Sequence, residues 1–298
     1  QVEKIASLTQ SESGIPPTVL ILGETGTGKD VVARLLHSKS NLNDRPFVHV
    51  DCASLPKDLI ESELFGHEKG AFTNANVARA GLIEAAENGV LFLDEIAEIP
   101  IDLQSKLLAV LERRSLRRIG STKELPVAAW IIAATNRDIE VLVKNREFRS
   151  DLYYRLNVMT IKMPSLRDRD NDIVLLSNYF ANLTSKRYGL SFDGFTKQAL
   201  KQIEEYSWHG NVRELKHLIE RAVLLNGGGT LDIKVLGLDK NDGINDEAEI
   251  INDVTLGEAE LRLIKIALER TNRNVSKAAR ELGITRMALR YRIKKYNL

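Results

Sequence analysis

The chain has 298 residues, 43% hydrophobic and 28% charged, an ordinary composition for a soluble globular protein with two or three compact units. Its single cysteine, Cys52, excludes an internal disulfide, and no apolar run approaches the roughly 18 residues that span a bilayer. No signal-peptide pattern opens the chain, so we expect a cytoplasmic protein with no membrane partner. The start at Gln1 rather than Met leaves room for a missing upstream part.

The formal net charge of +1 is unevenly distributed. Residues 275–298 hold seven basic side chains and one acid, a local charge of +6, which leaves −5 for the rest of the chain. A basic end domain favours nucleic acid as a partner, because phosphate neutralisation requires clustered Lys and Arg. On charge alone, a solvated helix face is an equally good explanation.

Short apolar runs alternate with helical patterns through the first half of the chain. This alternation predicts a parallel sheet with helices on both faces, the α/β class. From about Pro164 the strands stop and the pattern becomes helical, which predicts a second, all-α unit. The predicted strands are 18–22, 47–50, 90–93 and 130–133, and the predicted helices are 30–37, 103–111, 173–188, 196–206 and 212–225.

The last part of the chain opens with a long segment of weak periodicity, residues 226–254, whose glycines and seven acids indicate a linker. A capping-box pattern at 255–258 then predicts a helix to about residue 271. After it, 275–282 and 285–296 are predicted helices joined by a tight turn at Gly283 and Ile284.

A glycine-rich segment follows the first predicted strand and opens a helix, which is the context of a P-loop. Its glycines let backbone N–H groups wrap phosphates, while Lys29 reaches the β and γ oxygens. A glycine-rich turn without a ligand is the alternative. The predicted nucleotide-binding residues are Gly23, Glu24, Thr25, Gly26, Thr27, Gly28, Lys29 and Asp30, the last standing where Ser or Thr usually holds Mg²⁺.

An apolar strand that ends in two carboxylates follows some sixty residues later. In this Walker B arrangement Asp94 would hold Mg²⁺, with Asp30 as an alternative ligand, and Glu95 would polarise the attacking water. Capping of the next turn is the other explanation for this acid pair. Asn136, at the end of another strand, is placed where a γ-phosphate sensor would lie, although Asn is also a common helix cap.

The segment Glu61-Ser-Glu-Leu-Phe-Gly-His-Glu-Lys-Gly-Ala-Phe-Thr73 closely resembles a family signature. It is similar to that of the AAA+ transcription activators that work with sigma-54, the NtrC-like bacterial enhancer-binding proteins. The resemblance covers about residues 18–298. It continues through 89–95, 132–138, 148–156 and 210–215.

The resemblance implies a homo-oligomer, from dimer to hexameric ring, with ATP between subunits. Arg149 and Arg155 match the arginine fingers that complete a neighbour's site, and surface ion pairing is their alternative role. Arg213 matches the sensor arginine of the lid. Asn211 and Glu214 have the pattern of a helix cap pair, which would place Arg213 in the first turn of its helix.

The resemblance also assigns a sigma-54 contact to an exposed loop. A glycine-flanked Phe72 at its tip suits a hydrophobic probe, and an aromatic tucked beneath the loop for stability is the alternative. The chain departs from the family at Asn74, a glycine in the signature, at Asp51, usually Asn, and at His209, usually Pro. The predicted contact residues are Gly70, Ala71, Phe72, Thr73, Asn74 and Ala75.

The C-terminal helices resemble the Fis-type helix-turn-helix of the same family. The second helix carries enough basic residues to contact bases and phosphates of double-stranded DNA, and Thr285 is its predicted N-cap. Residues 256–268 are the expected dimer-pairing helix. A basic hairpin for protein contact is the alternative. The predicted DNA-binding residues are Thr285, Arg286, Arg290, Tyr291, Lys294 and Lys295.

Together these features predict four parts: an AAA+ α/β subdomain at 1–163, a helical lid at 164–238, an acidic linker at 239–254 and a DNA-binding domain at 255–298. The predicted function is an ATPase, with ATP and Mg²⁺ as cofactors, that binds upstream DNA and remodels sigma-54 RNA polymerase into open complexes. A DNA-binding regulator that has lost sigma-54 contact through Asn74, and a AAA+ helicase or initiation factor, are the alternatives. A two-component setting is left open.

Overall fold

The structure of the chain is a computed structural model. It describes residues 2–10, 16–56, 59–73, 75–169, 171–238, 268, 271, 274–281 and 286–296. The chain divides into two compact units, Gln1–Gly237 and Leu238–Leu298.

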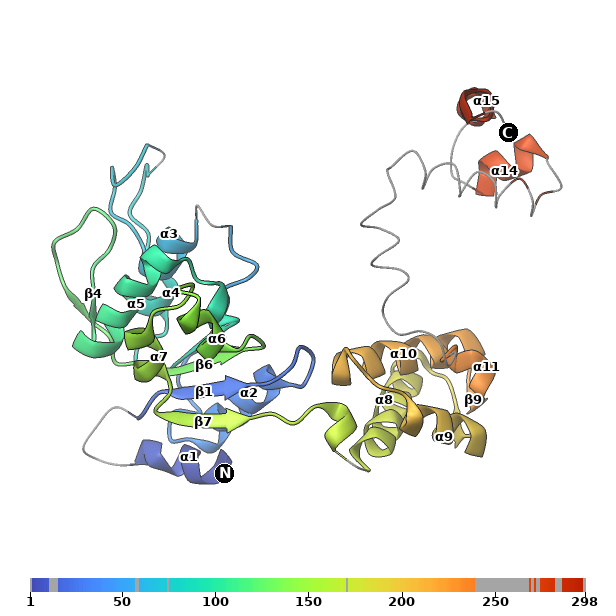
Figure 1. The fold of residues 1–298 in the computed structure, drawn as a ribbon, viewed down its shortest axis with the longest axis horizontal. Coiled ribbons are helices and arrows are strands. Elements are labelled where there is room, and N and C mark those ends of the chain that lie inside the picture. The colour runs from blue at the N-terminus through green and yellow to red at the C-terminus, as the bar shows by residue number, and fades with distance from the viewer. Residues whose placement is uncertain are drawn as a thin grey trace. The chain divides into compact units, whose positions relative to one another are not determined.

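The first unit is built on a five-stranded sheet in which every strand pair is parallel (Figure 1). The predicted α/β class is confirmed. One strand, β7, was not predicted. In the order β2-β3-β6-β1-β7 the strands are β2 (Phe47–Asp51), β3 (Val90–Asp94), β6 (Trp130–Thr135), β1 (Val19–Leu22) and β7 (Met159–Lys162).

Helices cover both faces of this sheet. The helices are α1 (Val2–Ser7), α2 (Lys29–Lys39), α3 (Ile60–Phe65), α4 (Leu82–Ala85), α5 (Ile101–Arg113), α6 (Ile139–Lys144) and α7 (Ser150–Leu156). Two 3-10 turns, η1 (Leu8–Gln10) and η2 (Ile96–Glu98), and a small hairpin of β4 (Ser115–Leu116) and β5 (Leu125–Pro126) complete this part.

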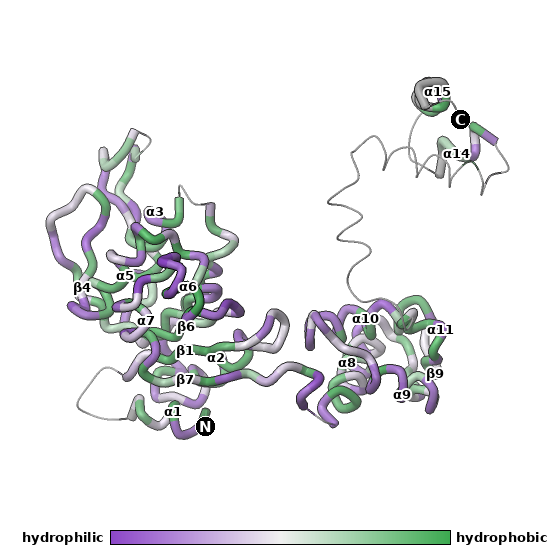
Figure 2. The backbone as a smooth tube through the Cα atoms, in the orientation of Figure 1, coloured by the Kyte–Doolittle hydropathy of each residue, from purple (hydrophilic) through white to green (hydrophobic). Residues whose placement is uncertain are grey.

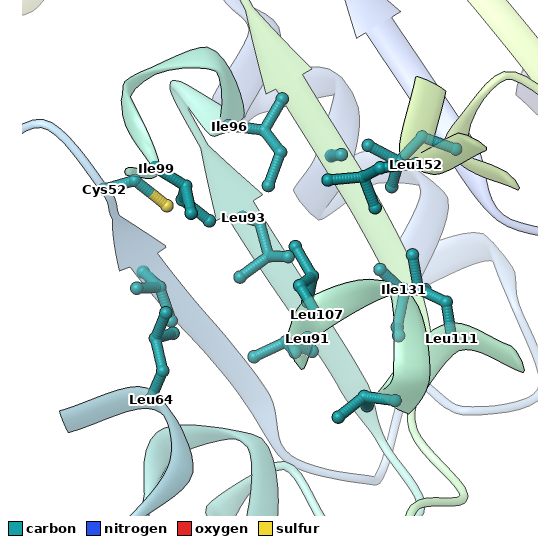
Figure 3. Close-up of a cluster of buried hydrophobic side chains, with 14 of the residues drawn as sticks. Cys52, Leu64, Leu91, Leu93, Ile96, Ile99, Leu107, Leu111, Ile131 and Leu152 are labelled. Atoms are coloured by element: carbon teal, nitrogen blue, oxygen red, sulfur yellow. The ribbon is translucent and has the colours of Figure 1, made fainter. Parts of the chain in front are cut away.

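The strands are apolar on both sides because successive residues point to opposite faces and both faces are buried. Figure 2 shows the hydrophobic colouring along β1 and β6. On one face Leu91 and Ile131 pack with Leu107 of α5 (Figure 3). On the other face Phe92 and Trp130 pack in the cluster that α1 and α2 cover. The carboxyl ends of β1, β6 and β3 therefore lie side by side on a rigid base.

The lid follows β7 and is mainly helical, as predicted. It comprises η3 (Leu166–Asp168), α8 (Asp172–Tyr188), α9 (Lys197–Glu205), α10 (Asn211–Asn226) and α11 (Ile233–Leu236). The expectation that strands stop near Pro164 was wrong at two short segments. β8 (Phe192–Phe195) and β9 (Gly229–Leu231) pair in parallel. Each is short and contains a glycine with positive φ, Gly194 or Gly229, so neither has the apolar run by which the longer strands were predicted.

The second unit contains the two helices predicted at the C-terminus, α14 (Val275–Glu281) and α15 (Arg286–Tyr296). They pack through Ala278, Ala279 and Leu289, with Ile293 partly buried beside them. The linker interpretation of 226–254 was wrong in its first part, because 229–231 form β9 and 233–236 form α11. The rest of the predicted linker, 239–254, and the predicted pairing helix up to residue 267 lie outside the described residues. No helix among the described residues is long and apolar enough to cross a membrane.

Candidate nucleotide site and associated surfaces

The predicted P-loop forms a tight turn between β1 and α2. Gly26 and Gly28 have φ of +79° and +94°, a left-handed backbone that glycine adopts without steric cost. Gly28 immediately precedes α2, so the loop ends at a helix N-terminus, where backbone N–H groups and the helix dipole favour an anion. Thr27 is buried, and its hydroxyl donates to the Glu24 carbonyl at 2.8 Å.

Lys29 is held against the loop rather than extended into solvent. Its side chain is 7% exposed, and Nζ donates to the carbonyl oxygens of Gly23 at 3.0 Å and Glu24 at 3.4 Å. Nζ also lies 3.5 Å from Oε1 of Glu95. The ammonium group is therefore placed between the loop backbone and the Walker B carboxylates.

The acid pair lies at the end of β3. Burial, followed by the charge of Glu95, raises the pKa of Asp94, whose Oδ1 accepts the Glu95 N–H at 3.1 Å. Glu95 has φ of +49° and makes no side-chain capping bond to η2. Its Oε2 instead accepts the Asn136 N–H at 3.0 Å. The capping explanation thus fails for Glu95.

Asn136 joins the acid pair to the P-loop. While its backbone binds Glu95, its Nδ2 donates to the hydroxyl of Thr25 at 2.7 Å. The ends of β6 and β3 and the loop after β1 are thereby linked by hydrogen bonds between residues 41 and 111 positions apart. Adjacent parallel strands bring these groups together.

The P-loop and the acid pair line an open cleft of about 680 Å³, within the size range of small-molecule sites. The lining residues from these two elements are Thr25, Gly26, Gly28, Lys29, Asp94 and Glu95, and Asn136 is not one of the lining residues. Asp30 and Asp51 lie on its α/β side, and Arg213 lies on the lid side. His49 was not predicted as a site residue, yet its Nε2 lies 3.6 Å from Oδ2 of Asp94. Its position on the strand beside β3 was the available signal. The lid adds four further lining residues, Phe180 from α8 and Val212, Lys216 and His217 from α10. Both helices were predicted, but these residues were not predicted to line the site.

Glu24, predicted as a nucleotide ligand, has its carboxylate directed toward the lid. It pairs with Arg167, with Nη1 to Oε2 at 3.1 Å, and accepts from Nδ2 of Asn211 at 3.0 Å. The hydrogen bonds from Arg167 and then Asn211 lower the pKa of Glu24. Its side chain is therefore engaged by protein groups.

Asn211 and Glu214 were predicted to cap the start of α10, and the prediction was wrong for Asn211. Glu214 does reach back, since its Oε2 accepts the Gly210 N–H at 2.8 Å. Asn211 makes no cap, because its fully buried amide is used by partners in the P-loop and η3. Arg213 nevertheless lies in the first turn of α10, as the sequence analysis expected.

The two finger candidates lie on and before α7. Arg149 pairs in its own chain with Asp151, with Nη2 to Oδ2 at 2.7 Å, and this partner raises its pKa. Arg155 donates from Nη2 to the Leu111 carbonyl at 3.0 Å. Both side chains are exposed. Neither arginine lines the nucleotide cleft of its own chain. This placement is compatible with a role in the site of another subunit.

The predicted sigma-contact loop is closed at its base by two backbone bonds, Gly70 N–H to the Ala75 carbonyl at 2.8 Å and Ala75 N–H to the Phe72 carbonyl at 2.9 Å. Phe72 is 42% exposed, and its ring meets His67 edge-on with centroids 4.9 Å apart. One part of the Phe72 ring is therefore exposed to solvent, and another part packs against His67. Ala71 and Thr73 complete the described part of the loop, and Asn74 lies outside the described residues.

On α15, Arg286, Arg290 and Tyr291 are exposed, whereas Leu289 faces α14. This is the distribution expected of a helix with one packed face and one free face. Lys294 and Lys295 belong to the helix, but their side chains, like Thr285, lie outside the described part.

The parallel sheet, the P-loop, the carboxylate pair at the next strand end and the helical lid define a P-loop ATPase domain of the AAA+ class. Residues 1–162 match the sigma-54 interaction domain, 167–249 match the AAA+ ATPase lid domain, and 255–296 match the Fis family of bacterial regulatory proteins. The chain belongs to the sigma-54 interaction domain family, and the predicted resemblance is confirmed.

Known relatives agree with this assignment. The chain is 45% identical over its whole length to the formate hydrogenlyase transcriptional activator FhlA of Escherichia coli (strain K12), covering 42% of that protein. It is 43% identical to the regulatory protein AtoC of the same organism, over 94% of this chain and 63% of AtoC. The chain thus spans about two fifths to two thirds of these relatives.

Among solved structures, NtrX from Brucella abortus in complex with ADP is similar over all of this chain and 67% of that one. The TM-score is 0.73 and the sequence identity is 29%. The α/β sheet, the lid and the C-terminal helices therefore occur together in another protein.

Proposed function

We propose that the chain binds ATP with Mg²⁺ in the cleft at the P-loop and hydrolyses it. The observation that carries this proposal is the hydrogen-bonded chain from Thr25 through Asn136 to Glu95, with Lys29 beside it. It brings a phosphate-binding loop, a cation and a carboxylate base within reach of one another, which is what phosphoryl transfer to water requires.

The residues fit a magnesium nucleotide. Gly26 and Gly28 give the loop the left-handed turns that a phosphate-binding backbone needs, and Lys29 supplies positive charge. Asp94 offers carboxylate oxygens, the ligand type that Mg²⁺ prefers, and Asp30 is the alternative. Bound Mg²⁺ would neutralise charge on the β and γ oxygens.

Within this site we assign distinct roles to the chain's own groups. Glu95 accepts the proton of the attacking water, and the Asn136 N–H fixes its orientation. Lys29 stabilises charge on the phosphates. Arg213, in the first turn of α10, contacts the nucleotide from the lid. Asp51 also lines the cleft and adds a negative charge to it.

The exposed arginines before and on α7 support a homo-oligomer, from dimer to ring. Arg149 and Arg155 would act on the site of a neighbouring subunit, where a trans arginine is worth about 10³–10⁵ in rate in other NTPases. The ion pair of Arg149 with Asp151 is exposed and readily exchanged for a phosphate.

ATP turnover would be coupled to a partner protein through the loop at 70–75. The half-exposed Phe72 and the match to the sigma-54 interaction domain support sigma-54 RNA polymerase as that partner. The Fis-type helices would hold the protein on upstream double-stranded DNA through Arg286, Arg290 and Tyr291. The four-part division at 1–163, 164–238, 239–254 and 255–298 belongs to the same proposal.

The test is open-complex formation with sigma-54 holoenzyme. The parent chain should support it, and Phe72→Ala should eliminate it while ATP hydrolysis continues. Asn74→Gly should change it modestly, because Asn tolerates a left-handed backbone better than other non-glycine residues. Asn74→Val should fail, because the family signature has a glycine at this position and a β-branched side chain does not tolerate the positive φ that glycine permits.

The second candidate, a DNA-binding AAA+ regulator without sigma-54 contact, makes the opposite prediction. In that case the parent would hydrolyse ATP without forming open complexes, and Asn74→Gly would restore them. Activity of the parent in this assay argues against that candidate.

A further inference from the structure

Asn211 is an unusual residue for the first position of a helix. Its side chain is fully buried, and its φ is +54°, in the left-handed region that costs a non-glycine residue free energy. Buried polar groups remain in a fold only when they are hydrogen-bonded. Strain and burial together indicate that the surrounding structure holds this amide in place.

Every polar atom of the Asn211 amide has a partner. Oδ1 accepts the N–H of Leu166 at 2.7 Å. Nδ2 donates to the Thr25 carbonyl and to Oε2 of Glu24, both at 3.0 Å, and approaches the His209 carbonyl at 3.3 Å. One side chain thus joins the P-loop, η3 and the start of α10.

Two arginines of the segment after β7 strengthen the same junction. Arg167 pairs with Glu24, but both side chains are more than two fifths exposed, and exposed pairs contribute little. Arg169 donates to the carbonyls of Thr27 at 2.7 Å and Pro164 at 2.9 Å. The buried amide of Asn211 is therefore the central contact and the arginines are peripheral to it.

The junction lies next to the cleft. Arg213 follows Asn211 by two residues and lines the cleft from the lid side. A Cβ added to Gly26 would lie only 2.2 Å from the Gly210 carbonyl oxygen, so the P-loop and the start of α10 approach at backbone distance. A shift of the Asn211 amide would therefore displace both the loop and the arginine.

We propose that Asn211 is a positioning residue for the nucleotide chemistry: its carboxamide seats the start of α10 on the P-loop and so places Arg213 at the phosphates. This inference rests on the proposed ATP site. It gives the asparagine a role in nucleotide binding and turnover, in place of the helix cap that its sequence pattern predicted.

Two substitutions separate the amide from the backbone strain. Asn211→Gly keeps the positive φ at no steric cost and removes only the contacts. Asn211→Asp keeps the size of the side chain but places a carboxylate oxygen against Glu24 and the Thr25 carbonyl. Each should weaken binding of a nonhydrolysable ATP analogue about tenfold or more and lower kcat. Asn182→Ala, which removes an exposed amide on α8, is the matched control and should change neither.

The decisive measurement is a double-mutant cycle with Arg213→Ala, performed by titration calorimetry on chains whose folding is checked by thermal unfolding. If Asn211 acts through Arg213, Arg213→Ala should lower affinity strongly in the parent and at most twofold in Asn211→Gly. A structural role alone gives additive losses, or a lower Tm with unchanged affinity, and either result overturns the inference.

The same titration distinguishes the two proposals. A folded parent chain that does not bind the analogue overturns the ATP site and this inference with it. A parent that binds, with both Asn211 variants binding equally well, overturns this inference alone.

Discussion

The close approach of Gly26 to the lid makes a specific substitution informative. Gly26 has φ of +79°, and an added Cβ would meet the Gly210 carbonyl oxygen at 2.2 Å. Ordinary van der Waals contact begins at about 3.4 Å. In Gly26→Ala the two backbones must therefore separate by about 1.2 Å, or the loop must change its path.

The cost of this substitution has two parts. A left-handed backbone costs an alanine roughly 1–2 kcal/mol. The second part is the displacement of α10 by the new methyl group. The methyl group meets a backbone carbonyl, which cannot change rotamer to relieve the contact as a long side chain can. Misplacement of a catalytic group by about 1 Å can lower turnover on the order of 100-fold. We expect Gly26→Ala to fold, with ATP turnover reduced by about this factor.

The chain contains a matched control for the first part. Gly189, at the C-terminus of α8, has φ of +67°, and a Cβ there would meet nothing within 4 Å. Gly189→Ala should lose about the same backbone free energy, measured as a lower Tm, with ATP turnover unchanged. If Gly26→Ala shows the same Tm as Gly189→Ala and turnover within twofold of the parent, the contact between P-loop and lid is absent from the active form.

Three further predictions follow from the proposed function. Lys29→Ala should abolish binding of an ATP analogue in titration calorimetry, whereas Glu95→Ala should bind it and fail to hydrolyse ATP. Arg149→Ala or Arg155→Ala should lower turnover sharply with little change in nucleotide affinity, and mixing either with Glu95→Ala subunits should restore part of the activity. Residues 1–238 alone should hydrolyse ATP without specific DNA binding, and binding by the whole chain should fall steeply with salt.

Each has an outcome that contradicts it. Loss of analogue binding in Glu95→Ala would remove its role as the base. No recovery at any mixing ratio would show that the arginines act within their own chain or only in structure. Sequence-specific DNA affinity retained by residues 1–238 would remove that role from the C-terminal helices.

The sheet and its loops could be predicted because their signals are local. Four apolar runs predicted β1, β2, β3 and β6 to within about two residues, since strands buried on both faces are almost continuously hydrophobic. β7 escaped because Met159–Lys162 is short and mixes polar with apolar residues. The helix predicted from residue 196 begins there: Thr196 is the N-cap of α9, and its hydroxyl accepts the Ala199 N–H at 3.2 Å.

The contacts between distant segments could not be predicted in the same way. Asn211 resembles a cap because cap patterns compare residues three or four apart, whereas two of its partners lie 186 and 187 residues away. The orientation of Glu24 depends in the same way on Arg167, 143 residues further along the chain. A single sequence contains no local signal for either contact.

The environment of Cys52 has a practical consequence. It is the only cysteine of the chain, it packs in the core beside the sheet (Figure 3), and burial raises the pKa of its thiol to about 12. Near neutral pH it is a protonated, inaccessible thiol and a poor target for maleimides. A new cysteine on the exposed face of α8, such as Asn182→Cys, can therefore carry a fluorophore selectively, which makes the lid's response to nucleotide measurable in the otherwise unaltered protein.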